Sequence, residues 1–148
     1  MIKQKSAGVI VFRRDGRGIK YLLLHHGGEY WNFPKGRQEA GETDVQTALR
    51  ELEEETGIKA IKLLDGFCHD YEYDFDTTVC DGVKEKIAKT AVFFLGEVVN
   101  DEVKISDEHF DFGWFDFDTA QRRMFYQRGR DCLKEAHQFL LKQQDFVL

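Results

Sequence analysis

The sequence predicts an α/β domain in which helices pack on a mixed β-sheet. Runs of β-branched and aromatic residues bounded by turn residues indicate the strands. Stretches with apolar residues three, four and seven positions apart indicate helices. Helices follow strands at intervals along the chain, which is the pattern of layered α/β domains. No repeat, low-complexity segment or linker interrupts this pattern, so we expect residues 1–148 to form a single domain.

The composition narrows the class of protein. A charged fraction of 32% with 14% aromatic residues is typical of a chain with a packed core rather than a disordered one. The net charge of −6 argues against general binding of a nucleic-acid backbone, which needs a basic surface. We find no signal peptide or bilayer-spanning apolar run, and Cys68, Cys80 and Cys132 have no CxxC spacing. We therefore expect a cytoplasmic protein with reduced thiols and no membrane partner.

The first part of the chain predicts a β-hairpin followed by a short extended segment. Ser6–Arg14 is a β-branched apolar run, and Ile19–His25 is a second apolar run. Turn residues at positions 15–18 indicate that the two strands pair as a hairpin. Residues 31–33 should be extended, because Pro34 disfavours the helical region for the residue before it.

A helix with defined ends comes next. Thr43 and Gln46 fit a capping box, in which each side chain accepts a hydrogen bond from the other residue's backbone N–H. Gly57 is placed to end the helix in the left-handed conformation. The apolar residues at helical spacing, which predict the buried face, are Val45, Ala48, Leu49 and Leu52.

The rest of the chain predicts further strands and two more helices. Ile58–Leu64 and Gly66–Phe75 look extended, whereas Asp76–Lys86 is polar and predicts a mobile loop. The next elements are a strand at Ala88–Val99, a polar connection at Asn100–His109, a strand at Asp111–Phe117 and a short helix capped by Asp118. A last helix at about Arg130–Lys142 should bury Leu133, Ala136, His137 and Leu140.

Three carboxylates crowd together on the first predicted helix. On a 3.6-residue wheel Glu51, Glu54 and Glu55 lie side by side. Glu53 points to solvent, and Arg50 lies one turn before Glu54, close enough to orient its carboxylate. Acidic runs on helices are ordinarily solvated faces, but carboxylates held this close also bind hard cations such as Mg²⁺ or Mn²⁺. Because Mg²⁺ is shared with substrate phosphates, the cluster indicates hydrolysis of a phosphoanhydride.

The stretch from Gly36 to Ile58 resembles the signature of the Nudix hydrolase family, G-x5-E-x7-R-E-U-x-E-E-x-G-U, in which U is a bulky apolar residue. The fixed positions are filled by Gly36, Glu42, Arg50, Glu51, Leu52, Glu54, Glu55, Gly57 and Ile58. At average composition, chance agreement is on the order of one in a billion per starting point. The match outweighs the interpretation as a solvated acidic face.

The resemblance implies an α/β/α sandwich and metal-dependent hydrolysis of a nucleoside diphosphate linked to another moiety. The metal ligands that it implies are Glu51, Glu54, Glu55 and the backbone carbonyl of Gly36, with Mg²⁺ or Mn²⁺ as the cofactor. Glu42 and Arg50 would support the loop and the helix, and Arg50 belongs with the glutamates in the catalytic set. The general base differs between members of the family, so the signature does not assign it.

The flanking residues are similar to the asymmetrical diadenosine tetraphosphate hydrolases. Trp31 to Gly36 resembles their W-x-x-P-K-G segment. Shorter similarities occur at Gly66–Phe67 with Tyr73, Lys89–Thr90, Glu108–His109 with Trp114, and residues 136–140. This resemblance implies that a small-molecule nucleoside polyphosphate, diadenosine tetraphosphate, is hydrolysed to ATP and AMP. By analogy Lys35 and Lys89 would contact phosphates, and Glu108 would be a further metal ligand or base.

Two aromatic residues have alternative interpretations. Tyr73 would stack on an adenine or is a plain aromatic residue of a sheet face. Trp31 would line the mouth of the site, although it is more typical of a packing residue. Two departures from these relatives affect the same region. Phe93 stands where some of them have Tyr, and Phe75–Lys86 is longer than in the compact animal enzymes.

Three alternative functions stay open. Removal of pyrophosphate from RNA 5′ ends uses the same signature, with a basic patch that Arg122, Arg123, Arg128 and Arg130 would supply. Hydrolysis of oxidised nucleoside triphosphates is another activity of the family. A non-catalytic nucleotide sensor with the same fold would typically lack signature glutamates, all of which this chain has.

Overall fold

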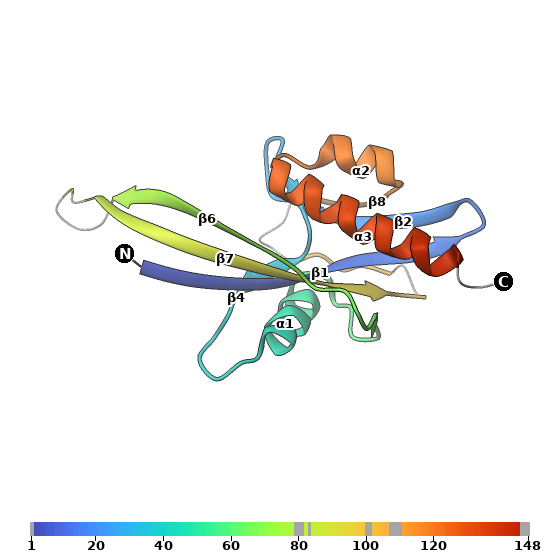
Figure 1. Ribbon diagram of the computed structural model, residues 1–148, viewed down its shortest axis with the longest axis horizontal. Coiled ribbons are helices and arrows are strands. Elements are labelled where there is room, and N and C mark those ends of the chain that lie inside the picture. Colours follow the sequence, from blue (N-terminus) through green and yellow to red (C-terminus); the bar gives the residue numbers. More distant parts are fainter. Residues whose placement is uncertain (1, 79–81, 83, 100–101, 107–110, 146–148) are drawn as a thin grey trace.

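The computed structural model describes the chain except for residues 1, 79–81, 83, 100–101, 107–110 and 146–148 (Figure 1). Its strands are β1 (Ile2–Asp15), β2 (Gly18–His25), β3 (Trp31–Asn32), β4 (Lys35–Arg37), β5 (Lys62–Leu63), β6 (His69–Thr78), β7 (Lys84–Glu97) and β8 (Asp111–Phe115). Its helices are α1 (Asp44–Thr56), α2 (Phe117–Arg123) and α3 (Gln127–Asp145). Among the described residues, no helix is both long and apolar enough to cross a membrane.

β1 forms the centre of a mixed sheet. It pairs in parallel with β7, from Ile2 opposite Ile87 to Phe12 opposite Glu97. It also pairs antiparallel with β2 and β4, so the predicted hairpin is confirmed. β5 and β6 pair antiparallel with β7, whereas β3 and β8 pair antiparallel with β2. The first residues of β1 continue with β6 and β7 as a three-stranded arm that extends beyond the helices (Figure 1).

Helices cover both faces of the sheet. Figure 1 shows α1 on one side and α2 with α3 on the other. Alternate residues of β1 point to opposite faces, so the strand contributes to two separate cores. Val9 packs in the core that contains Leu52 of α1, and Ile10 packs in the core that contains Leu133 of α3. The predicted α/β/α sandwich with a mixed sheet is confirmed.

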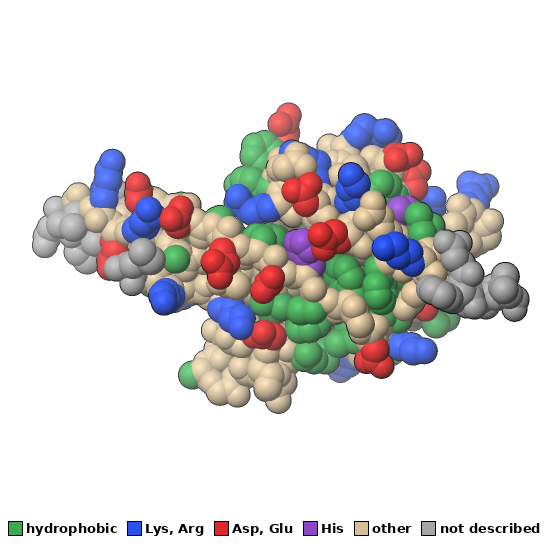
Figure 2. All heavy atoms as spheres, viewed as in Figure 1, with side chains coloured by type: hydrophobic (Ala, Val, Ile, Leu, Met, Phe, Trp, Pro, Cys, Tyr) green, Lys and Arg blue, Asp and Glu red, His purple; other side chains and the backbone are tan. Residues whose placement is uncertain are grey.

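The predicted mobile loop over Asp76–Lys86 is wrong at both of its ends. Asp76, Thr77 and Thr78 continue β6 and pair with the first residues of β7. An ion pair joins the two strands here, since Nζ of Lys86 lies 3.3 Å from Oδ2 of Asp74. Figure 2 shows acidic and basic side chains mixed along the arm. Exposed polar strands lack the apolar alternation that identifies a half-buried strand in a sequence, which is why this pairing was not predicted.

The start of α2 also differs from the prediction. Asp116, rather than Asp118, caps the helix, because its carboxylate accepts a hydrogen bond from the backbone N–H of Thr119 at 2.8 Å. The strand β8 therefore ends at Phe115, two residues earlier than predicted. Strand β5 is likewise shorter than predicted and covers only two residues of the extended segment 58–64.

The buried faces of α1 and α3 were predicted in part. On α1, Ala48 and Leu52 are fully buried, but Val45 and Leu49 are 38% and 36% exposed. The apolar spacing therefore overestimated the width of the face that meets the sheet. On α3, the three predicted aliphatic residues are fully buried. His137 is half-buried, and its Nδ1 lies 2.7 Å from the hydroxyl oxygen of Tyr21.

Candidate active site

α1 is held at both ends by local hydrogen bonds. Oγ1 of Thr43 accepts a hydrogen bond from the backbone N–H of Gln46 at 3.1 Å, and Oε1 of Gln46 accepts one from the N–H of Thr43 at 2.9 Å. The predicted capping box is therefore confirmed. Gly57 ends the helix with φ 75°, and its N–H donates to the carbonyl of Glu53. The carboxylates of the second half of α1 thus project from a fixed support.

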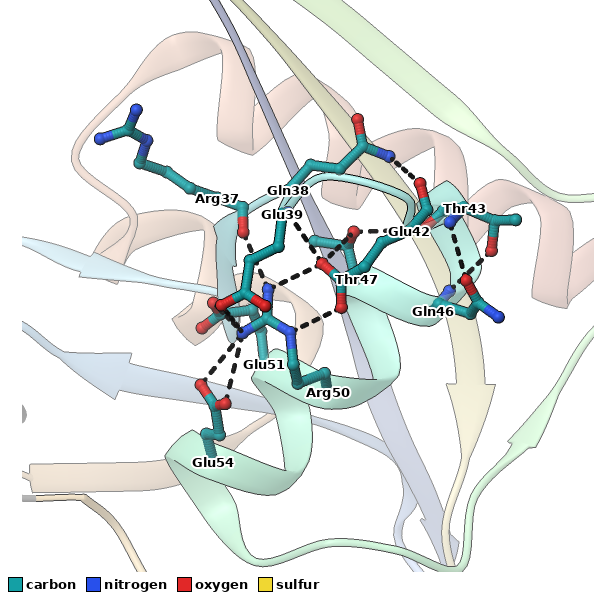
Figure 3. Close-up of polar contacts among 10 residues, drawn as sticks. All are labelled: Arg37, Gln38, Glu39, Glu42, Thr43, Gln46, Thr47, Arg50, Glu51 and Glu54. Carbon is teal, nitrogen blue, oxygen red and sulfur yellow. Dashed lines mark hydrogen bonds and ion pairs between the residues drawn. The ribbon is translucent and has the colours of Figure 1, made fainter.

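Arg50 connects the loop before α1 to the carboxylates of the helix (Figure 3). Its Nε and Nη2 donate to the two carboxylate oxygens of Glu42 at 2.7 and 3.0 Å, and Nη2 also donates to the carbonyl oxygen of Arg37. Its Nη1 donates to Oε1 of Glu51 at 2.9 Å and to Oε2 of Glu54 at 3.2 Å. The paired guanidinium lowers the pKa of Glu42 to about 2 and the carboxylates raise the pKa of Arg50. These contacts suit residues that support the loop and the helix.

The backbone of β4 lies directly against two of these carboxylates. A Cβ atom on Gly36 would lie 1.9 Å from Cδ of Glu51, so only glycine fits between the strand and this side chain. The N–H of Lys35 donates to Oε1 of Glu55 at 2.8 Å, and Glu55 is only 5% exposed. The side chain of Glu54, which accepts hydrogen bonds from Arg50, is 57% exposed.

The donor atoms at this edge of α1 fit a hard divalent cation in their chemistry, because all of them are oxygens. Glu51 and Glu54 share Nη1 of Arg50, so their carboxylates already approach a common cationic group. In the described part of the chain, no three His, Cys, Asp or Glu side chains converge closely enough to hold a metal ion. Oε1 of Glu55 is directed toward Lys35 instead. Glu108, the further predicted ligand or base, lies outside the described residues.

Basic side chains lie on the other face of β4. Successive strand residues point to opposite faces, so Lys35 and Arg37 lie on one face while Gly36 faces Glu51. Lys89 of β7 points to the same face, because it lies opposite Gln4 of β1 whereas Lys35 lies opposite Gly8, four residues further along. Partial burial and then the positive charges of Lys35 and Arg37 lower the pKa of Lys89. Among the described residues, no carboxylate forms an ion pair with these three cations. The group favours an anionic ligand.

A cleft of about 520 Å³ runs along the arm beside Lys89. Its lining residues are Lys3, Gln4, Glu72, Tyr73, Asp74, Ala88, Lys89 and Thr90. The sheet register places Tyr73 opposite Lys89 and Lys89 opposite Gln4. Two predicted substrate-binding residues, Lys89 and Tyr73, therefore come together. Lys3 and Gln4 were not predicted, because the parallel pairing of β1 with β7 leaves no local signal in the sequence.

Tyr73 belongs to a row of aromatic side chains on β6. Its ring centroid lies 6.0 Å from that of Tyr71 and 6.2 Å from that of Phe75. The guanidinium of Arg128 covers one ring face, with Cζ 3.8 Å from the centroid of Tyr73. Partial burial raises the pKa of the Tyr73 hydroxyl, so the phenol stays neutral at physiological pH.

Trp31 and Phe93 are packed among other aromatic rings. Trp31 stacks on His25 at a centroid distance of 4.7 Å and meets Phe115 edge-on at 5.5 Å. Its outer side borders a second cleft of about 490 Å³ next to α2. Phe93 is fully buried, and its ring centroid lies 5.3 Å from that of Phe33. The replacement of Tyr by Phe at this position therefore lies in the core and not in the cleft along the arm.

Comparisons with known proteins agree with this arrangement. Residues 2–136 match the model of the NUDIX domain. A bis(5′-nucleosyl)-tetraphosphatase [asymmetrical] of Rattus norvegicus is 36% identical over 148 residues, covering 92% of this chain and 95% of the relative. An RNA pyrophosphohydrolase of Bartonella bacilliformis is 27% identical over 154 residues, covering 92% and 91%. The structure of a C. elegans Ap4A hydrolase binary complex superposes with a TM-score of 0.80 at 26% identity, covering 94% and 98%.

Proposed function

The chain belongs to the Nudix hydrolase family, and we propose that it hydrolyses a phosphoanhydride bond of diadenosine tetraphosphate to give ATP and AMP. The similarity to asymmetrical bis(5′-nucleosyl)-tetraphosphatases over nearly the whole chain supports this substrate. We also propose that residues 1–148 work as one domain, since one sheet carries both cores, and that this domain acts in the cytoplasm.

The position of β4 between carboxylates and cations carries the proposal. Gly36 contacts Glu51 on one face of the strand, and Lys35 and Arg37 lie on the other face beside Lys89. A polyphosphate that crosses this strand would have its oxygens bound by the cations on one face and its phosphorus atoms beside the carboxylates on the other. A nucleoside or a neutral ester has no anionic oxygens for the cations to bind, whereas a phosphoanhydride chain has several along its length.

A divalent cation would bind on the acidic side of β4. The oxygen atoms that would hold Mg²⁺ or Mn²⁺ belong to Glu51, Glu54, Glu55 and the carbonyl of Gly36, with Glu108 as a further ligand or base. When bound, such a cation neutralises charge on the phosphoryl oxygens and lowers the pKa of water. The rotation of Glu54, which is the most exposed of the three helix carboxylates, would complete the ligand set.

The chain's own residues would then orient the reaction. Arg50 fixes Glu51 on the strand side of α1, and Lys35 and Lys89 hold the phosphate chain against β4. The oxygen of a water molecule forms a bond to one phosphorus, the bond from that phosphorus to the bridging oxygen breaks, and a carboxylate accepts the proton. Tyr73 would stack on an adenine at the end of the cleft that also contains Lys89.

The substitution Glu54→Gln tests the acidic side of the proposal. It keeps the shape of the side chain but removes its charge, so we expect kcat to fall by roughly 10²- to 10⁴-fold at saturating Mg²⁺. Glu53→Gln is the matched control, because Glu53 lies on the same helix, is exposed, and contacts only Lys59 at 3.7 Å among the ion pairs of the described residues. Ordinary activity of Glu54→Gln, measured from the release of ATP and AMP, would contradict the assignment of the metal site.

Removal of pyrophosphate from RNA 5′ ends is the second candidate function. The similarity to an RNA pyrophosphohydrolase favours it, as do the three arginines that border the cleft beside Trp31. Mass spectrometry of products from diadenosine tetraphosphate and from a 5′-triphosphate oligonucleotide, run side by side, separates the two activities. If pyrophosphate is released from the oligonucleotide faster than diadenosine tetraphosphate is hydrolysed, the RNA activity is favoured over our proposal. Binding without turnover of either compound, measured by calorimetry with Mg²⁺ or Mn²⁺, would instead identify a nucleotide sensor.

A further inference from the structure

The first turn of α3 places an arginine over the aromatic row of β6. Cζ of Arg128 lies 3.8 Å from the ring centroid of Tyr73, 4.5 Å from that of Tyr126 and 5.9 Å from that of Tyr71. A distance of 3.8 Å is van der Waals contact between a planar guanidinium and a ring face. This is also the position that a nucleobase would take if it stacked on Tyr73.

Arg128 is held there by the rings. Among the described residues, its guanidinium forms no hydrogen bond or ion pair, unlike that of Arg130, which donates to the carbonyls of Met124 and Phe125. The helix dipole disfavours a cation in the first turn of α3, so the local backbone does not stabilise it either. Each cation–π contact at a partly exposed site shifts an equilibrium by only about two- to fivefold.

Two carboxylates of α3 line a cleft beside Arg128. Arg128 lines this cleft of about 490 Å³ together with the carboxylates of Asp131 and Glu135. Oδ1 of Asp131 accepts a hydrogen bond from Nε2 of Gln127 at 2.7 Å, which leaves Oδ2 for a second donor, whereas Glu135 pairs with His69. Asp131 is three residues further along α3, which is the spacing at which helix side chains meet. Rotation about the side-chain bonds of Arg128 would therefore exchange its contacts with Tyr73 and Tyr126 for an ion pair with Asp131.

We propose that Arg128 gates the base-binding site, stacking on Tyr73 and Tyr126 in the free protein and moving toward Asp131 when a nucleobase stacks on Tyr73. The proposal rests on the proposed function, in which Tyr73 receives the base. A ligand that binds only the open form has its apparent affinity reduced by the fraction of open molecules. Opening breaks the contacts of Arg128 with the rings of Tyr73 and Tyr126, each of which changes the equilibrium by about two- to fivefold. The apparent affinity is therefore reduced by about tenfold. Arg128 thus sets how tightly the base end of a substrate is held.

The substitution Arg128→Ala tests the gate through binding of AMP to the Glu54→Gln protein, measured by calorimetry. Removal of the guanidinium frees the ring of Tyr73, so AMP should bind about tenfold more tightly. Ribose 5-phosphate, which has no base, should bind equally to both proteins. Lys142→Ala is the matched control, because it removes one positive charge from an exposed position of the same helix that does not line the cleft beside Arg128. That substitution should leave the affinity for AMP unchanged.

Weaker or unchanged binding of AMP to Arg128→Ala would overturn the proposal, as would an equal change for ribose 5-phosphate. A double-mutant cycle adds an independent readout. Asp131→Asn removes the carboxylate that receives Arg128, so it should weaken AMP binding about threefold when Arg128 is present and have no effect in Arg128→Ala. An equal effect in both backgrounds would show that Asp131 acts without Arg128. Failure of the unsubstituted protein to hydrolyse diadenosine tetraphosphate would refute the proposed function, but leaves this comparison of AMP affinities intact.

Discussion

A single methyl group at Gly36 tests whether β4 and α1 must be in direct contact for catalysis. In Gly36→Ala, the new Cβ would lie 1.9 Å from Cδ of Glu51 and 2.2 and 2.3 Å from its two carboxylate oxygens. Ordinary contacts of a Cβ atom begin at 3.4 Å. The carboxylate or the strand must therefore move by about 1.5 Å, which is comparable to a covalent bond length.

Either movement disturbs the candidate site. If Glu51 rotates away, its 2.9 Å hydrogen bond from Arg50 is lost. If β4 moves, the N–H of Lys35 withdraws from Glu55, which it now contacts at 2.8 Å. Misplacement of a catalytic group by 1 Å can cost about 100-fold in rate, so we expect kcat/KM for diadenosine tetraphosphate to fall at least that much. Overpacking costs about 1–3 kcal/mol, which lowers Tm by roughly 2–12 °C.

The assay compares ATP and AMP release, followed by chromatography, with Tm, followed by circular dichroism. Gly16→Ala is the matched control, because a Cβ on Gly16 meets nothing within 4 Å and the residue is not in the left-handed region. That variant should keep both activity and Tm. Unchanged activity and Tm in Gly36→Ala would refute the close contact, and a lower Tm with unchanged activity would refute its role in catalysis.

Two more predictions concern the network around Arg50. Arg50→Ala removes the partner that the carboxylates of Glu42 and Glu51 share, so urea denaturation should show a free energy of unfolding lower by about 1–3 kcal/mol. Arg50→Lys should restore little of this loss, because an ammonium cannot bind both oxygens of Glu42 in parallel. Full recovery in Arg50→Lys would contradict the bidentate geometry. The pKa of Glu42 is about 2 in the folded protein and 4.5 ordinarily, so its contribution to stability is present above pH 4.5 and is lost as the pH falls toward 2. Thermal melts between pH 5 and 2 should therefore decline less steeply for Glu42→Gln than for the unsubstituted protein, and parallel curves would exclude this carboxylate as a source of acid sensitivity.

The sequence predicted best those features that depend on neighbouring residues. Thr43, Gln46 and Gly57 determine both ends of α1 through hydrogen bonds within a few positions, and the structure has the helix between them. The prediction of Asp118 as the cap of α2 was wrong for a local reason, since the cap is Asp116. Both aspartates precede residues that favour a helix, and only the geometry of the hydrogen bond to Thr119 distinguishes them.

Features that depend on long-range pairing were predicted less well. The ends of β6 and β7 pair with each other on an arm whose exposed faces have no apolar alternation, so the sequence resembled a loop. The same limit applies to the width of the buried face of α1. Val45 and Leu49 have the spacing of buried residues, but only the position of the helix on the sheet determines how many of its side chains are covered.

The candidate site combines both kinds of information. The signature placed the carboxylates of α1, whereas the grouping of Lys35 with Lys89 and of Lys89 with Gln4 follows from the register between β1, β4 and β7. Tyr73 shows why this matters for substrate choice. It shares one face of β6 with Tyr71 and Phe75, and the side chain that covers its ring comes from the first turn of α3. Because a stacked base and Arg128 compete for one ring, the affinity for the base depends on a contact between two segments distant in the sequence.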